Sequence, residues 1–155
     1  MGTVNTRSVI AAVDFLPTVA ELAGVTLPSN LNLDGENISD ALFGSPWKRK
    51  KSLYWQYRFE ARGRSIDRSP MLAIRKGRWK LLMNPDFTRM ELYDMNDSPR
   101  ELNNVFDENG YGTSSIAQQQ LSESLMRWQA ELPEGPGDPL AGSDSYPTED
   151  QLGLL

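Results

Sequence analysis

The 155-residue sequence contains neither cysteine nor histidine. Without cysteine it can form no disulfide, no thiolate nucleophile and no cysteine metal site, and thiol usage does not reveal a redox compartment. Without histidine it lacks the commonest general base and the commonest transition-metal ligand. The two absences exclude the common catalytic triads and zinc sites. Carboxylates or an oxygen-ligated metal are the chemistry left to the chain alone.

Long apolar runs are also missing. No stretch approaches the roughly 18 residues of a membrane span, so we expect no membrane segment. The first residues lack the basic region and apolar run of a signal peptide. A hydrophobic content of 39% suits one domain with a modest core, or a small domain with attached segments. Ten prolines and twelve glycines predict many turns.

Charge is unevenly distributed along the chain, whose formal net charge is −5. Residues 48–80 hold twelve of the sixteen cations and only two acids, Glu60 and Asp67, a net of +10. The other 122 residues carry a net of −15. This basic segment could attract a sulfated sugar, a phosphate ester or a nucleic acid. The alternative is that its cations pair with acids elsewhere in the fold.

Two segments have the spacing of amphipathic helices, and a short helical turn is expected around residues 39–43. The first helix should start near Asp14, with Pro17 in its first turn, and end at Gly24. Its apolar stripe comprises Leu16, Val19, Ala20, Leu22 and Ala23. The second helix should end at Pro133, and its stripe comprises Ile116, Ala117, Leu121, Leu125, Trp128 and Leu132. The first stripe is expected to remain exposed unless something covers it.

Four segments have strand character. In "SLYWQYR" (52–58), Leu53, Trp55 and Tyr57 alternate with Tyr54, Gln56 and Arg58. The stretch "MLAIRKGRWKLLMN" (71–84) predicts a hairpin that turns at Gly77. A fourth strand is expected in "MELYDM" (90–95). The core should include Trp79, Leu81, Leu92 and Trp128. Strands followed by a covering helix predict an α+β fold, a four-stranded antiparallel sheet packed against a C-terminal helix.

The fourth strand runs into "NDSPRE" (96–101), which is typical of a sharp corner followed by one capped helical turn. Ser98 can cap the turn, Pro99 fits its first position, and Glu101 can reach back to the N–H of Ser98. After Pro133 the sequence is rich in Gly, Pro, Asp and Ser, and we expect a loosely held tail.

Candidate chemistry is sparse. There is no Gly-rich phosphate loop and no EF-hand spacing, and no carboxylate pair stands out as catalytic. Nucleic acid is an unlikely partner because the aromatics of the basic segment alternate with strand period. The polar face of the first strand and the following loop form a candidate rim beside a cleft. The candidate substrate-binding residues are Gln56, Arg58, Arg62 and Arg64, with Tyr54 on the same predicted face.

Five blocks of sequence, taken in order, resemble the C-terminal part of arylsulfatase-like sulfatases, members of the alkaline phosphatase superfamily. They are "VDFLPTVAELAGVTLP", "LDGENISDALFG", "LYWQYR", "AIRKGRWKLL" and "ELYDMNDSPRELNNV". The resemblance implies that residues 1–52 are the end of a large α/β domain and its connector. Residues 53–132 would be the smaller C-terminal subdomain, and 133–155 the loose tail.

The same resemblance implies that the catalytic apparatus lies elsewhere. Such sulfatases use a formylglycine made from Cys or Ser in a Cys/Ser-x-Pro-x-Arg motif, together with calcium. The stretch "TLPSN" only echoes this motif, because Thr26 stands where Cys or Ser is needed and Asn30 where Arg is needed. No catalytic or metal-binding residue can therefore be assigned to this chain, and it should be inactive alone.

The leading hypothesis is a non-catalytic subdomain of a sulfatase, whose partner is the missing N-terminal catalytic domain. Two alternatives stay open: the same subdomain of a phosphate or phosphonate ester hydrolase, and a stand-alone module that binds acidic polysaccharide or nucleic acid. The exposed apolar surface could also drive dimerisation. The resemblance implies an exported parent protein.

Overall fold

The computed structural model describes residues 4–5, 8–57, 69–110, 112 and 114–133. The chain separates into two compact units, Met1–Leu53 and Tyr54–Leu155. We call them unit 1 and unit 2. The predicted loose tail lies outside the described residues, except for Pro133.

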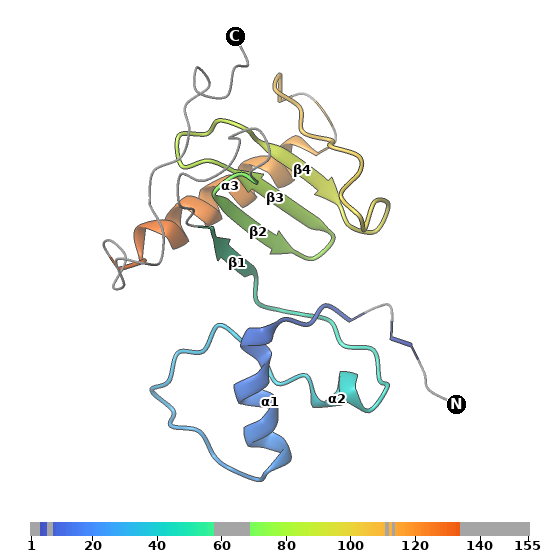
Figure 1. The fold of residues 1–155 in the computed structure, drawn as a ribbon, viewed down its shortest axis with the longest axis vertical. Helices are drawn as coiled ribbons and strands as arrows, with labels where there is room; N and C mark the ends of the chain where they lie inside the picture. Colours follow the sequence, from blue (N-terminus) through green and yellow to red (C-terminus); the bar gives the residue numbers. More distant parts are fainter. Residues whose placement is uncertain (1–3, 6–7, 58–68, 111, 113, 134–155) are drawn as a thin grey trace. The chain divides into compact units, whose positions relative to one another are not determined.

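Unit 1 is built around one short helix. The 3-10 turn η1 (Ala12–Asp14) leads into α1 (Phe15–Leu22), and α2 (Ser39–Leu42) follows after a long loop (Figure 1). Gly24 ends α1 as predicted, with a positive φ of 67° that glycine adopts without steric cost. The predicted helical turn around residues 39–43 is confirmed by α2.

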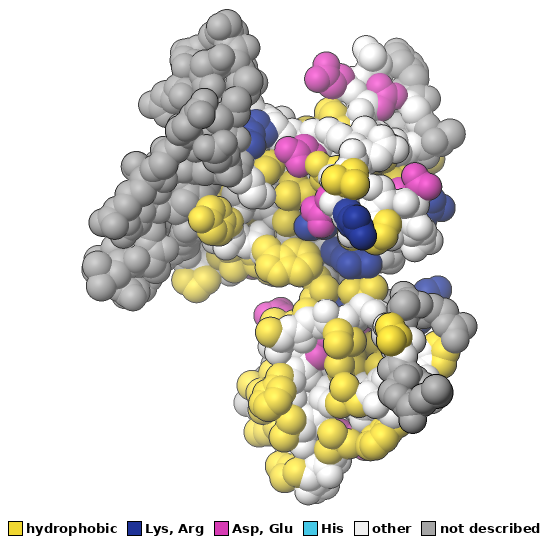
Figure 2. Space-filling model, turned by 45° about the vertical axis from the view of Figure 1, so that its right-hand side comes forward, with side chains coloured by type: hydrophobic (Ala, Val, Ile, Leu, Met, Phe, Trp, Pro, Cys, Tyr) yellow, Lys and Arg dark blue, Asp and Glu magenta, His cyan; other side chains and the backbone are white. Residues whose placement is uncertain are grey.

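Most of the predicted apolar stripe of α1 is exposed: Leu16, Val19 and Leu22 are 43–51% exposed, whereas Ala20 is buried together with Thr18. Phe15, outside the predicted stripe, is 73% exposed. Figure 2 shows hydrophobic side chains gathered over the visible face of this unit. An eight-residue helix is marginal by itself. Unit 1 must therefore draw its order from contacts other than a core beneath this stripe.

Unit 2 is a four-stranded sheet with a helix on one face. Its strands are β1 (Leu53–Gln56), β2 (Leu72–Lys76), β3 (Trp79–Met83) and β4 (Glu91–Asp94), hydrogen-bonded in the order β1-β2-β3-β4. The predicted hairpin is confirmed: β2 and β3 pair antiparallel with Ile74 opposite Leu81, and Gly77 turns with φ 59°. Leu81 in turn faces Leu92 of β4.

Helix α3 (Ser115–Ala130) covers one face of the sheet. Alternation places one set of side chains from the strands against it, and these form the core with two leucines of the helix. The core residues are Met71, Leu72, Ile74, Leu81, Met83, Leu92, Leu121 and Leu125. Trp79 and Trp128 are partly buried and pack against this core. The predicted α+β class is confirmed.

Two details of α3 differ from the prediction. Ile116 is 70% exposed rather than buried, and the helix ends at Ala130, before Leu132. Ser122 is buried instead, with its hydroxyl donating to the carbonyl of Gln118 at 2.9 Å. This bond within the helix satisfies the hydroxyl, so a serine can occupy a position that the apolar pattern did not indicate.

The corner after β4 is a series of turns, so the predicted helical turn is wrong, although the Ser98 hydroxyl does accept a backbone N–H, that of Leu102, at 3.0 Å. Glu101 does not reach back to Ser98; its carboxylate contacts Lys80 Nζ at 2.7 Å. Glu101 also has a positive φ of 58°, which helical backbone excludes. A charged partner on β3 therefore outweighs the local capping pattern.

No helix among the described residues is long and apolar enough to cross a membrane.

The core predicts which truncations matter for unit 2. Leu81→Ala should lower its free energy of unfolding by about 2–5 kcal/mol, because Leu81 is fully buried between β2, β4 and α3. Ile116→Ala removes an exposed side chain and should change it by less than about 0.5 kcal/mol. Urea unfolding followed by far-UV circular dichroism measures both. Equal effects would contradict the assignment of the core.

Candidate functional site

Of the four candidate substrate-binding residues, only Gln56 lies among the described residues. It is the last residue of β1 and is partly buried. Arg58, Arg62 and Arg64 lie outside the described residues. Their grouping into a substrate-binding site therefore stays a prediction.

Tyr54, which the sequence places on the rim, is directed toward α3. Its ring stacks on Trp128 with centroids 5.1 Å apart, and its hydroxyl lies 2.8 Å from the hydroxyl of Ser124. Alternation along the strand puts Gln56 on this same, helix-covered side. The interpretation of Tyr54 as a rim residue is wrong, because a contact with a helix 70 residues away is invisible in the local pattern.

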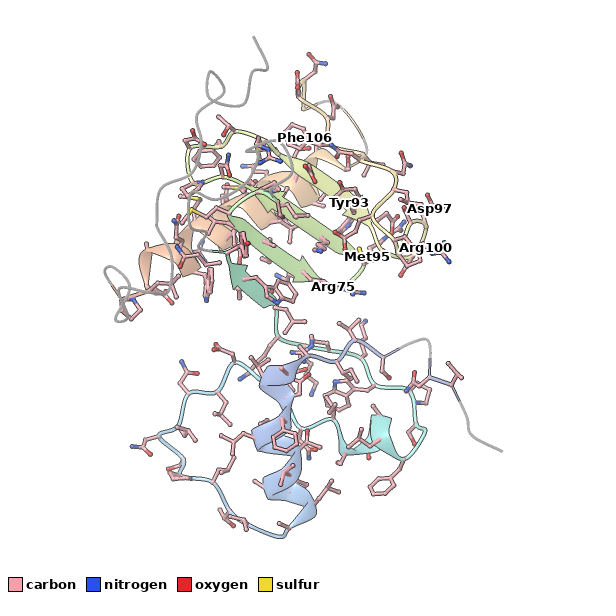
Figure 3. The ribbon with its side chains drawn as sticks, in the orientation of Figure 1. Arg75, Tyr93, Met95, Asp97, Arg100 and Phe106 are labelled. Atoms are coloured by element: carbon pink, nitrogen blue, oxygen red, sulfur yellow. The ribbon has the colours of Figure 1, made fainter. Side chains whose placement is uncertain are left out.

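The outer face of the sheet, turned away from α3, carries a row of polar side chains. Register places Arg75, Lys80 and Tyr93 side by side on β2, β3 and β4. Lys80 binds both carboxylate oxygens of Glu101, and the Tyr93 hydroxyl donates to Glu91 Oε2 at 2.8 Å. In Figure 3, Arg75 and Tyr93 lie on the sheet, with Asp97 and Arg100 in the corner after β4.

Burial shifts two groups in this row. It raises the pKa of the Tyr93 phenol to about 12, with further contributions from the hydrogen bond to Glu91 and from the charges of Glu91 and Glu101. Burial also lowers the pKa of Arg75, against the opposing effect of Glu101. The Arg75 side chain has its Nε buried without a hydrogen-bond partner.

Unit 1 contains a buried ion pair that sequence reasoning missed. Asp14 binds the guanidinium of Arg49, and both side chains are more than nine-tenths buried. Asp14 also accepts the N–H of Ala11 at 2.8 Å and the N–H of Glu36 at 2.9 Å. Asp14 precedes the first residue of α1, but its carboxylate accepts no N–H of that helix.

Several cations of the basic segment 48–80 do pair with acids elsewhere in the fold. Arg49 pairs with Asp14, Arg78 with Asp94, and Lys80 with Glu101. These pairs account for part of the segment's positive charge. The arrangement stabilises the fold and does not resemble acid–base chemistry.

The described part of the chain contains no arrangement of residues that indicates a catalytic or metal site. No group of three or more acidic, histidine or cysteine residues there could hold a metal ion. The "TLPSN" segment contributes Thr26 and Leu27 to an open pocket of about 410 Å³ beside α1. Glu21 is the one ionisable side chain lining it. The residues present therefore do not fit a calcium site or a formylglycine nucleophile.

Residues 2–131 match the family model described as "N-sulphoglucosamine sulphohydrolase, C-terminal". The chain belongs to this family. It is 31% identical over 128 residues to an N-acetylglucosamine-6-O-sulfatase of Bacteroides thetaiotaomicron, which covers 79% of the chain and 22% of that protein. It is also 36% identical over 77 residues to arylsulfatase A of Homo sapiens, covering 48% of the chain and 14% of that protein. The suspected sulfatase resemblance is confirmed.

Solved structures agree. One sulfatase domain neighbour, determined "in complex with its substrate D-Glucosamine-2-N, 6-O-disulfate", is 30% identical and aligns with a TM-score of 0.55, covering 77% of this chain and 24% of that one. A 2-O GAG sulfatase aligns over 92% of this chain and 32% of that one with a TM-score of 0.52 at 21% identity, which shows the fold. The chain thus spans about a quarter of the length of its relatives.

The Asp14 network makes unit 1 sensitive to acid. Burial alone would raise the pKa of Asp14, but the hydrogen bonds from Arg49, Glu36 and Ala11 and the charge of Arg49 together lower it. A lowered pKa means stability that is present above the unfolded value of about 4 and lost as pH falls through the folded value.

Asp14→Asn should therefore destabilise unit 1 by about 3–5 kcal/mol at neutral pH, because Arg49 is left buried without a counter-charge. The variant should also lose stability less steeply than the wild type below pH 4. Hydrogen exchange at α1 amides measures both effects. Glu21→Gln, an exposed acid on the same helix, is the control. An unchanged acid dependence in Asp14→Asn would refute this role.

Proposed function

We propose that this chain is the non-catalytic C-terminal subdomain of a sulfatase that hydrolyses sulfate esters of sugars. The observation that carries the proposal is the family match over residues 2–131. The similarity to an N-acetylglucosamine-6-O-sulfatase supports a sulfated sugar as substrate. The same subdomain of a phosphate or phosphonate ester hydrolase, and a free-standing polysaccharide or nucleic-acid module, are not favoured by any of these observations.

The chemistry would lie in the rest of the protein. The sequence contains no Cys/Ser-x-Pro-x-Arg motif and no histidine, so the sulfatase nucleophile motif and its histidine partners must come from elsewhere. Calcium and formylglycine, which the resemblance implies for the whole enzyme, would likewise be held there. This subdomain would contribute its own folded sheet and helix, and side chains that line the substrate pocket. Export of the whole protein stays a prediction from the resemblance.

The exposed stripe of α1 supports a covering partner. Phe15, Leu16, Val19 and Leu22 are each exposed on an eight-residue helix. Exposed apolar surface of this kind is typical of an interface. We infer that the N-terminal catalytic domain of the same protein covers it, since the relatives are about four times longer than the matched region. Dimerisation through the stripe is the competing outcome for the chain alone.

The mass of the native gene product tests the proposal directly. A product several-fold larger than 17.4 kDa is expected, because the relatives carry most of their length outside this region. Intact-mass spectrometry of the protein from its source cells gives the answer. A native product of 17.4 kDa would overturn the proposal that this chain is part of a larger sulfatase, and would favour a free-standing binding module.

The substrate role of the rim is a separate prediction. In the whole enzyme, Arg58→Ala and Arg62→Ala should each lower kcat/KM for a sulfated sugar by roughly tenfold or more, since each removes a charge-assisted hydrogen bond to an anion. Arg64→Ala and Gln56→Ala complete the series. Lys76→Ala, an exposed cation at the end of β2, should leave kcat/KM unchanged. Unchanged kcat/KM in all four rim variants, across several sulfated sugars, would show that the rim does not touch substrate.

A further inference from the structure

The outer face of the sheet carries an exposed tryptophan close to an arginine that has no hydrogen-bond or ion-pair partner among the described residues. Trp55 of β1 is 43% exposed. The backbone bond from Tyr57 N–H to the Met71 carbonyl, 2.7 Å long, aligns β1 with β2. In an antiparallel pair this alignment places Trp55 opposite Ala73, and Arg75 follows two residues along the same face. Strand spacing and rise put the Cα atoms of Trp55 and Arg75 roughly 8 Å apart.

Arg75 has a charge that no described residue satisfies. Its side chain makes no hydrogen bond or ion pair with the described residues, and its Nε is buried without an acceptor. Glu101, whose charge acts on Arg75, accepts hydrogen bonds from Lys80 Nζ with both carboxylate oxygens at 2.7 Å. Glu91 accepts the hydroxyl of Tyr93. Arg75 is partly exposed as a residue, so an acceptor from outside can bind the part of its side chain that reaches the surface, although the Nε itself is buried.

We propose that Trp55 and Arg75 bind one sulfated sugar residue on the outer face of the sheet. The indole of Trp55 packs against the C–H face of the sugar ring, as aromatic side chains do with flat apolar surfaces. The guanidinium of Arg75 forms paired hydrogen bonds with the sulfate oxygens. Ala73, opposite Trp55, and the buried Leu53, opposite Arg75, are their neighbours on this face.

The size and charge of this surface favour a sugar over a protein partner. Leu82 and Tyr93 on the same face are already buried, so little apolar surface is exposed there beyond Trp55. A stable protein interface needs about 800 Å² per partner, far more than one indole and one guanidinium offer. The inference takes its ligand class from the proposed function, but the site is distinct from the rim, because Gln56 lies on the opposite side of β1.

Nuclear magnetic resonance titration of the 155-residue chain tests the site. The probes are D-glucosamine 6-sulfate, unsulfated D-glucosamine and sodium sulfate, with the indole N–H of Trp55 and the Nε–H of Arg75 as reporters. Saturable shifts of both reporters are expected with the sulfated sugar at concentrations where the other two probes give weaker shifts. A shift of Arg75 alone, equal with sodium sulfate, would overturn the proposal and leave a simple anion site. The absence of any saturable shift would also overturn it.

Variants separate the two contacts. Arg75→Gln should weaken binding of D-glucosamine 6-sulfate roughly tenfold to a hundredfold and remove the preference for the sulfated sugar. Trp55→Ala should weaken binding of both sugars about tenfold. Lys76→Gln, an equal loss of charge at the neighbouring position on the other face, should bind as the wild type does. Arg75→Lys keeps the charge without the paired geometry and should recover only part of the affinity. Equal binding by Arg75→Gln and Lys76→Gln would refute the role of Arg75.

Binding by the 155-residue chain does not depend on hydrolysis. The whole protein could be a sulfatase while these variants bind like the wild type, so a failure of this inference is distinguishable from a failure of the proposed function.

Discussion

Unit 1 depends on one buried carboxylate. Asp14 ends the turn η1, and its side chain accepts hydrogen bonds from Ala11, from Glu36 more than twenty residues on, and from Arg49. The hydroxyl of Thr18, one turn along α1, joins the same network through the Asp14 carbonyl and the N–H of Ile38. Loop segments without regular structure are thereby fixed to the start of a short helix. In unit 1, hydrogen bonds to buried polar groups hold the segments together, as an apolar core does in unit 2.

Unit 2 has the opposite design. Its sheet and α3 share a core of eight buried side chains, and its ion pairs lie at the margins. Apolar burial of this extent supplies most of the stability of a small domain. Unit 2 is stabilised by its apolar core. Unit 1 has exposed apolar side chains and is stabilised by hydrogen bonds to a few buried groups.

Features encoded by neighbouring residues were predictable from the sequence. The hairpin at Gly77 and the buried Leu121 and Leu125 of α3 follow from alternation and helical spacing within short windows. Features that depend on distant partners were not. Stacking of Tyr54 on Trp128 determines which face of β1 packs against α3. The ion pair of Glu101 with Lys80 determines the conformation of the corner after β4. The Asp14–Arg49 pair joins residues 35 apart, and no local pattern identifies which arginine is buried.

If the proposed site binds a sugar, the two faces of the sheet have separate roles. Substitutions beneath α3 change the packing of the core cluster. Substitutions at Trp55 or Arg75 act on the outer face, where Trp55 is 43% exposed. If the reacting groups lie outside this chain, contacts on the outer face bind ground state and transition state alike. Such contacts alter KM more than kcat, so this face can set which sugar is held without altering how its ester is cleaved.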